Sequence, residues 1–181
     1  GVGTLTGDLF QRSLGFNGFT FAIPIERSAR ATALGRQLIA GQEGHWQIYI
    51  ENNRLVANVL GVEVQAVAPD VGECSKIILT GYFDHALAFF GKKEATLALY
   101  VDQKRVDSAV INTFELPLEG YELATTLGQN HLGEARFSGF LGRPVILNEM
   151  LLEDGLSDAW LDNSVSALST PNCEGAVSGV L

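Results

Sequence analysis

Lysine, cysteine and long apolar runs are all scarce in this chain. Only four of its 181 residues are lysines, and 12 basic residues face 21 acidic ones, which gives a net charge of -9. Because such a chain repels a phosphate backbone, we exclude nucleic acid as a partner. No run reaches the roughly 18 apolar residues that cross a bilayer, which argues against membrane insertion.

Signals of secretion are also missing. The first residues, "GVGTLTGDLF", contain neither the basic nor the apolar region of a signal peptide, so the chain uses another route or has lost its leader. No Asn-x-Ser/Thr sequon occurs. Cys74 and Cys173 are too few for a disulfide framework. One long-range bridge stays open, but we favour two reduced thiols, since sequence alone does not place their Cα atoms within bridging distance.

What the chain has in abundance is short β-branched or aromatic runs separated by Gly and Asn. They recur about every 8 to 12 residues, which is typical of antiparallel strands in sandwiches and jelly rolls. We expect about twelve to fourteen strands, and hence an all-β, two-sheet antiparallel β-sandwich. The runs cover residues 19–25, 36–41, 45–51, 54–61, 62–68, 75–84, 86–91, 95–111, 121–128, 135–147 and 149–153.

Residues 45–61 carry the clearest hairpin signal. Asn52 and Asn53 both tolerate positive φ, so they suit a two-residue turn. Period-two alternation then sets one face of the first strand opposite one face of the second. The two faces are Trp46, Ile48 and Ile50, and Leu55, Ala57 and Val59.

Helix signals are few, so we expect one or two short helices. In residues 156–168, Ser157 can cap a helix whose apolar residues recur at helical spacing. Residues 26–36 could form a second helix, but we favour a loop. We divide the chain into an N-terminal arm or first edge strand (1–14), the jelly-roll domain (15–168) and a tail that could add one strand (169–181).

The order of these segments resembles the laminin-G-like, concanavalin A-like lectin-glucanase jelly-roll superfamily. The likeness covers about residues 15 to 165. It includes an opening "FTF", a "W-x-I-Y-I" strand, an "N-R-L" strand, an "L-x-L-Y-V-D" hairpin and a closing "F-x-G-F" to "L-S" stretch. The matching residues are Phe19, Thr20, Phe21, Trp46 to Ile50, Asn53 to Val56, Leu97 to Asp102, Phe137 to Phe140, and Leu156 to Asp158.

The chain departs from this pattern at three places. Gln103 stands where the family has Gly after the hairpin Asp, so we predict a longer loop over residues 102–105 in place of a type I′ turn. Residues 76–84 lack the usual Trp and His, and residues 142–149 replace a "D-E-V-R-I" strand. These losses weaken the transfer of family function to this chain.

Signatures of catalysis are missing as well, so we expect no enzyme. No E-x-D-x-x-E segment provides the paired carboxylates of a glycosidase, and no R-x-E-L-R with Q-x-H marks a lyase. The acidic clusters have the wrong spacing and predict loop edges, and the histidines lack metal-site spacing. These residues are Glu115, Glu119, Glu122, Glu149, Glu153, Asp154, His45, His85 and His131.

No cofactor is expected, although the resemblance implies calcium as an option. Loop carboxylates at Asp84, Asp102 and Asp107 could supply hard oxygen ligands. We favour ordinary turn carboxylates and assign no metal ligand.

Five residues are candidates for binding. Arg27, Arg30 and Arg36 lie close together in an acidic chain and could contact an acidic partner, although a solvated loop is the alternative. Trp46 and Tyr82 could stack on sugars. Ile48 and Ile50 share the face of Trp46, however, which favours the core for that side chain.

Together these features predict a non-enzymatic recognition or structural module that acts by surface contact. We expect a virion decoration or attachment protein, or a cell-surface adhesion component, in a virion or extracellular location. Its partner would be the protein surface of a larger assembly or a glycan, and open edge strands could form a homo-oligomer. The alternatives are a lectin-like carbohydrate-binding module and, less favoured, a polysaccharide hydrolase or lyase.

Overall fold

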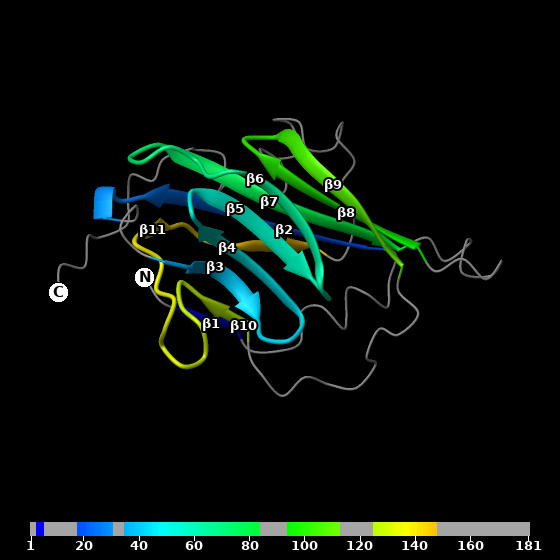
Figure 1. The fold of residues 1–181 in the computed structure, drawn as a ribbon, viewed down its shortest axis with the longest axis horizontal. Coiled ribbons are helices and arrows are strands. Elements are labelled where there is room, and N and C mark those ends of the chain that lie inside the picture. Colours follow the sequence, from blue (N-terminus) through cyan, green and yellow to red (C-terminus); the bar gives the residue numbers. More distant parts are fainter. Residues whose placement is uncertain (1–2, 6–17, 31–34, 84–93, 113–124, 148–181) are drawn as a thin grey trace.

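The computed structural model describes residues 3–5, 18–30, 35–83, 94–112 and 125–147, which form twelve strands in two antiparallel sheets (Figure 1). This architecture confirms the predicted two-sheet β-sandwich. Sheet A has the order β1 (Gly3–Leu5), β10 (Thr125–Leu127), β3 (Gln37–Gln42), β4 (Trp46–Glu51), β5 (Arg54–Val59) and β6 (Val62–Val67). Sheet B has the order β11 (Gly139–Leu141), β2 (Gly18–Arg27), β7 (Cys74–Phe83), β8 (Glu94–Val101) and β9 (Lys104–Asn112), and β12 (Val145–Leu147) also pairs with β2.

The core lies between the sheets and follows period-two burial. In β4 and β5 the inward residues pair as predicted, Trp46 with Val59, Ile48 with Ala57, and Ile50 with Leu55. Strands β2, β7 and β8 contribute the opposite layer, and the ring centroids of Phe21 and Trp46 lie 5.2 Å apart. Burial of these large apolar side chains is the main favourable term in folding. The inward residues of that layer are Phe21, Ile23, Ile25, Ile77, Leu79, Leu97 and Leu99.

The two hairpin turns are alike, which confirms one prediction and corrects another. Asn52 and Asn53 have φ of 51° and 60°, as expected for the predicted two-residue turn. Asp102 and Gln103 also have positive φ, 50° and 70°, and β9 begins at the next residue. The longer loop predicted over residues 102–105 is therefore wrong.

Asp102 explains how this second turn forms without glycine. Its backbone N–H donates to the Lys76 carbonyl at 2.9 Å, and its Oδ1 accepts from the Lys76 N–H at 2.8 Å. These two bonds fasten the turn to the start of β7. Asp also tolerates the left-handed region better than most residues.

Other predicted elements differ at their ends. The strand predicted over residues 135–147 is two short strands, β11 and β12, because Gly142, Arg143 and Pro144 interrupt it. In the segment 26–36, β2 continues to Arg27 and Ala29 and Arg30 adopt a 3₁₀ conformation. The predicted elements at 86–91, 149–153 and 156–168 lie outside the described residues. The described part of the chain has no helix that is long and apolar enough to cross a membrane.

Cys74, at the start of β7, is disulfide-bonded. The favoured interpretation of two reduced thiols is therefore wrong for this residue. The sequence holds one other cysteine, Cys173, which lies outside the described residues.

At the open side of the sandwich, β6 and β9 are the outermost strands of their sheets, and Asp107 links them by a hydrogen bond. This residue lies on β9, and its Oδ2 accepts from the backbone N–H of Gln65 on β6 at 2.8 Å, while its Oδ1 accepts from Ser108 N–H at 2.8 Å. The carboxylate thus links the two sheets and occupies a donor on the β6 edge. Inward charges of this kind protect strand edges from pairing with other chains.

Replacing Asp107 with alanine should lower the free energy of unfolding by about 1 kcal/mol, because the two hydrogen bonds that its solvent-exposed carboxylate accepts, from Gln65 and from Ser108, are lost. Urea unfolding measures this change. The exposed neighbour Ser108 provides a control, since Ser108→Ala keeps both bonds to Asp107 and should unfold like the wild type. Equal stability of the two variants would contradict a role for the carboxylate in joining the sheets.

Candidate functional site

The two outer faces of the sandwich differ. On sheet B, the outward residues Ala22, Ile78, Ala98 and Tyr100 are buried and form a small apolar cluster. On sheet A, residues 128–138 lie along β3, because Leu38 N–H donates to the Ala135 carbonyl at 2.7 Å and Gly128 N–H donates to the Ile39 carbonyl at 2.9 Å. The candidate site lies on the outer face of β3, between this segment on one side and β4 on the other.

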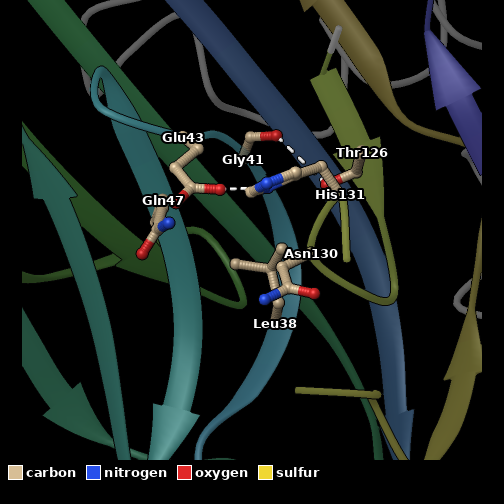
Figure 2. A pocket seen from close by; sticks show the side chains of 7 residues that line it. All are labelled: Leu38, Gly41, Glu43, Gln47, Thr126, Asn130 and His131. Carbon is tan, nitrogen blue, oxygen red and sulfur yellow. Dashed lines mark hydrogen bonds and ion pairs between the residues drawn. The ribbon is translucent and has the colours of Figure 1, made fainter. Parts of the chain in front are cut away.

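A shallow hollow with a cavity volume of about 10 Å³, room for about one water molecule, lies at this place and is partly open to solvent (Figure 2). Strand β3, the turn after it, β4, β10 and the loop after β10 all contribute to its lining. The lining combines one apolar side chain with a carboxylate, two amides, an imidazole and a hydroxyl. Its residues are Leu38, Gly41, Glu43, Gln47, Thr126, Asn130 and His131.

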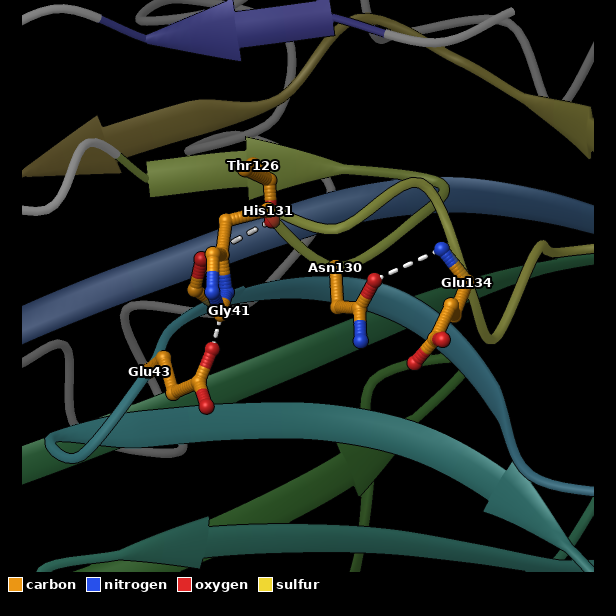
Figure 3. Close-up of polar contacts among 6 residues, drawn as sticks. All are labelled: Gly41, Glu43, Thr126, Asn130, His131 and Glu134. Carbon is orange, nitrogen blue, oxygen red and sulfur yellow. Dashed lines mark hydrogen bonds and ion pairs between the residues drawn. The ribbon is translucent and has the colours of Figure 1, made fainter.

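Polar contacts hold several of these residues in place (Figure 3). His131 Nδ1 contacts the Glu43 carboxylate, which forms an ion pair when the imidazole is protonated. Thr126 Oγ1 donates to the Gly41 carbonyl at 3.4 Å. The Asn130 Oδ1 accepts from Glu134 N–H at 2.7 Å, and Asn130 N–H donates to the Glu134 carbonyl at 3.0 Å. The loop after β10 is therefore fixed by its own hydrogen bonds.

Two amide groups at the hollow keep hydrogen-bonding capacity. Within the described residues, the Gln47 side chain makes no hydrogen bond, and neither does the Nδ2 of Asn130. Each amide nitrogen carries two donors, and the Gln47 oxygen is also an acceptor. These groups are available to a ligand.

Gly41 sets the shape of the hollow at the β3–β4 pair. A Cβ at this position would lie 2.7 Å from the Trp46 carbonyl oxygen and 3.0 Å from the Cγ of Gln47. A larger residue would therefore push against β4 and displace the Gln47 side chain. Glycine is the residue that this close approach of the strands requires.

Tyr49, the next outward residue on β4, is covered. The Arg36 guanidinium lies 3.6 Å from the centre of its ring, and Tyr49 Oη donates to Glu63 Oε1 at 3.2 Å. Asn58 Nδ2 donates to the same oxygen at 3.1 Å. Tyr49 is 4% exposed, so Arg36 and not the aromatic ring meets solvent here.

The pKa of the Tyr49 phenol is raised above its ordinary value of 10.0, chiefly because burial disfavours the phenolate. The folded state thus retains a proton that the unfolded chain loses as the pH passes 10. The resulting stabilisation is complete below this pH and is lost as the pH rises through the raised pKa. Wild-type stability should fall more steeply than that of Tyr49→Phe between about pH 9 and 11. Parallel curves from urea unfolding would contradict this expectation.

The five predicted binding residues do not form one exposed cluster. Arg27 is 3% exposed, and its Nη1 donates to Asn53 Oδ1 at 2.9 Å and to the Pro69 carbonyl at 2.7 Å, so it supports the β4–β5 turn. Arg30 is exposed, and Arg36 covers Tyr49. The prediction of an exposed arginine patch that includes Arg27 is therefore wrong.

The two aromatic candidates have different outcomes. Trp46 is 2% exposed and packs in the core, so the sugar-stacking role fails and the core alternative holds. Tyr82 lies on β7 and pairs with Gly18 of β2, but its side chain lies outside the described residues.

The carboxylates considered for calcium are engaged in backbone hydrogen bonds where they are described. Asp102 bonds to Lys76, and Asp107 bonds to Gln65 and Ser108, while Asp84 lies outside the described residues. In the described ranges, no group of three or more His, Cys, Asp or Glu side chains is placed to hold a metal ion. Calcium binding stays an untested option.

Sequence reasoning missed the residues that line the hollow. In the sequence, His131 is a histidine without metal-site spacing, and Glu43, Gln47 and Asn130 belong to no motif. Their meeting depends on the pairing of β10 with β3, where Thr126 lies opposite Gly41. Local periodicity gives no information about a pairing between strands more than 80 residues apart.

Comparisons with known proteins support the fold. No family model and no curated protein matches this sequence. The receptor-binding domain of botulinum neurotoxin C/D mosaic serotype matches with a TM-score of 0.59 and 10% identity over 91% of this chain and 40% of that one. The binding domain of botulinum neurotoxin DC in complex with SialylT matches with a TM-score of 0.56 and 14% identity, over 90% of this chain and 39% of that one.

A proposed carbohydrate-binding protein from Bacteroides ovatus matches with a TM-score of 0.57 and 17% identity over 78% of this chain and 40% of that one. In each case the match spans about two fifths of the neighbour's chain. Identities this low establish the fold alone. The chain therefore has a β-sandwich fold that also occurs in proteins named for receptor binding or carbohydrate binding.

Proposed function

We propose that this chain is a non-enzymatic binding module that recognises glycans through the hollow on the outer face of sheet A. The observation that carries the proposal is the lining itself. The amides of Gln47 and Asn130 and the carboxylate of Glu43 line the hollow, while Leu38 is buried. Sugar hydroxyls both donate and accept hydrogen bonds, so amides and a carboxylate that are not fully buried suit them.

The comparisons support binding as the type of activity. The neighbours are named as receptor-binding domains of botulinum neurotoxins and as a proposed carbohydrate-binding protein. Fold alone does not determine function, so the proposal depends on the hollow of this chain. An extracellular or surface location would agree with such a role.

A second candidate is a structural role by protein contact, in a virion decoration protein or an adhesion component. It is favoured by exposed valines near the open side of the sandwich, where Val67 on β6 is 75% exposed and Val110 on β9 is 56% exposed. Edge strands with apolar side chains can pair with another chain. The same experiment distinguishes the two candidates.

The test is a glycan array with the wild type and two matched variants. Gln47→Leu removes an amide from the hollow, whereas Gln65→Leu makes the same change on an exposed residue of β6 outside it. We expect the wild type and Gln65→Leu to bind the same glycans, and Gln47→Leu to bind about tenfold more weakly, which corresponds to one lost hydrogen bond. An array without binding, together with self-association that Val110→Asp abolishes, would favour the structural role instead.

A further inference from the structure

We infer that residues 148–173 cover the outer face of sheet B and are fastened there by a disulfide between Cys74 and Cys173. Three features of the described residues support this arrangement: the burial of outward side chains on sheet B, the position of Cys74, and the place where the chain leaves the sheet. The binding role proposed for sheet A does not depend on it.

The outward side chains at the centre of sheet B are shielded from solvent. They form two rows of cross-strand neighbours on β2, β7 and β8, and each of them is at most 2% exposed. An uncovered face of an antiparallel sheet leaves its outward side chains in water, as Val110 on β9 shows with 56% exposure. The two rows are Ala22, Ile78 and Tyr100, and Thr20, Thr80 and Ala98.

The described part of the chain does not provide the cover. Its strands belong to the two sheets, and sheet A packs against the inner face of sheet B. No described hydrophobic residue outside β2, β7 and β8 packs against the apolar cluster of the outer face. Because this burial is that of a single chain, residues outside the described ranges supply the cover.

Cys74 ties the C-terminal part of the chain to this face. On β7, Ile77 and Leu79 point into the core, so period-two alternation turns Cys74 outward. It therefore shares a face with Ile78. Cys74 is disulfide-bonded, and the sequence holds one other cysteine, Cys173. The bridge thus brings the end of the segment to the outer face of sheet B.

The segment also begins beside this face. The last described strand is β12, and Leu147 at its end pairs with Thr20, a member of the second row. Thr20 pairs in turn with Thr80 on β7, and from there the rise of a strand places Cys74 about 20 Å away. Residues 148–173 are long enough to span several times that distance. The excess length can therefore fold across the two rows.

The composition of the segment suits a cover. The sequence predicts a helix over residues 156–168, with apolar side chains at helical spacing. A helix that lies on a sheet buries such a stripe against the outward apolar side chains of the strands, which here include Ile78 and Tyr100. A covered sheet B leaves the outer face of sheet A and the open side of the sandwich for partners. The stripe consists of Trp160, Leu161, Val165 and Leu168.

Peptide mapping and thermal unfolding of the full-length protein test the fastening. We expect one linked pair of peptides, containing Cys74 and Cys173, from a protein that runs as a monomer without reductant. Cys74→Ser and Cys173→Ser should each lower the melting temperature by about 5 to 15 °C. The double variant should match them, because all three lose the same bridge. A covalent dimer, a free thiol at either position, or a Cys173→Ser variant as stable as the wild type would overturn the inference.

NMR of the isotope-labelled full-length protein tests the cover. Ile77 and Ile78 are a matched pair, because they are neighbours on β7 but lie on opposite faces of the sheet. We expect nuclear Overhauser contacts from the Ile78 methyl groups to side chains of residues 148–173, whereas the Ile77 methyl groups contact only the core between the sheets. Contacts from Ile78 to another part of the chain instead, or to nothing beyond sheet B, would show that the segment is not the cover.

Discussion

Replacing Trp46 with alanine should lower the free energy of unfolding by about 3 to 5 kcal/mol, the largest effect expected in this chain. The indole is 2% exposed and lies between the sheets, with its ring centroid 5.2 Å from that of Phe21. Truncation removes this buried area and leaves a cavity that the flanking strands can fill only in part. Urea unfolding followed by circular dichroism measures the loss.

Two further variants make this prediction sharper. Trp46→Phe keeps an aromatic ring against Phe21 and should lose less stability than the alanine variant. Val110→Ala, at a position that is 56% exposed, should stay within about 0.5 kcal/mol of the wild type. A stable Trp46→Ala variant would mean that Trp46 is not in the core, and its role as a ligand-stacking residue would have to be reconsidered.

Gly139→Ala should also be strongly destabilising, by about 1 to 3 kcal/mol or more. Gly139 has φ of 154° and pairs with Arg27, and a Cβ there would lie 2.0 Å from the Glu26 carbonyl oxygen. Because that contact is with backbone, either β11 or β2 must move, and the pairing between them is disturbed. Thermal unfolding of the purified variant measures the effect.

Gly35→Ala is the matched control for this substitution. No heavy atom lies within 4 Å of a Cβ at Gly35, and the residue is exposed. This variant should therefore unfold within about 0.5 kcal/mol of the wild type. Equal melting temperatures for both alanine variants would contradict the close approach of β11 to β2.

The sequence allowed much of the sandwich to be predicted, because the relevant signals are local. The alternation of Trp46, Ile48 and Ile50 predicts one buried face, and the two asparagines predict the turn that follows. The turn at Asp102 and Gln103 was not predicted, since it is fastened by Lys76, which is 26 residues away. The expectation that a two-residue turn needs glycine takes no account of a hydrogen-bond partner elsewhere in the chain.

The candidate site could not be predicted for the same reason. Glu43 and Gln47 meet Asn130 and His131 only because β10 pairs with β3, and no periodicity encodes that pairing. For Arg27 the sequence predicted an exposed binding residue, and the structure shows a buried one. It belongs to a charged segment, yet Asn53 and Pro69 accept its hydrogen bonds and hold it inside the protein.

The most direct test of the central claim is an NMR titration of isotope-labelled protein with the glycan that binds best on the array. The proposed site predicts that backbone amide shifts concentrate at Gly41, Gln47, Asn130 and His131, while Val67 and Val110 on the outermost strands stay unchanged. Shifts at those valines with none around the hollow, or no shifts at all, would contradict it.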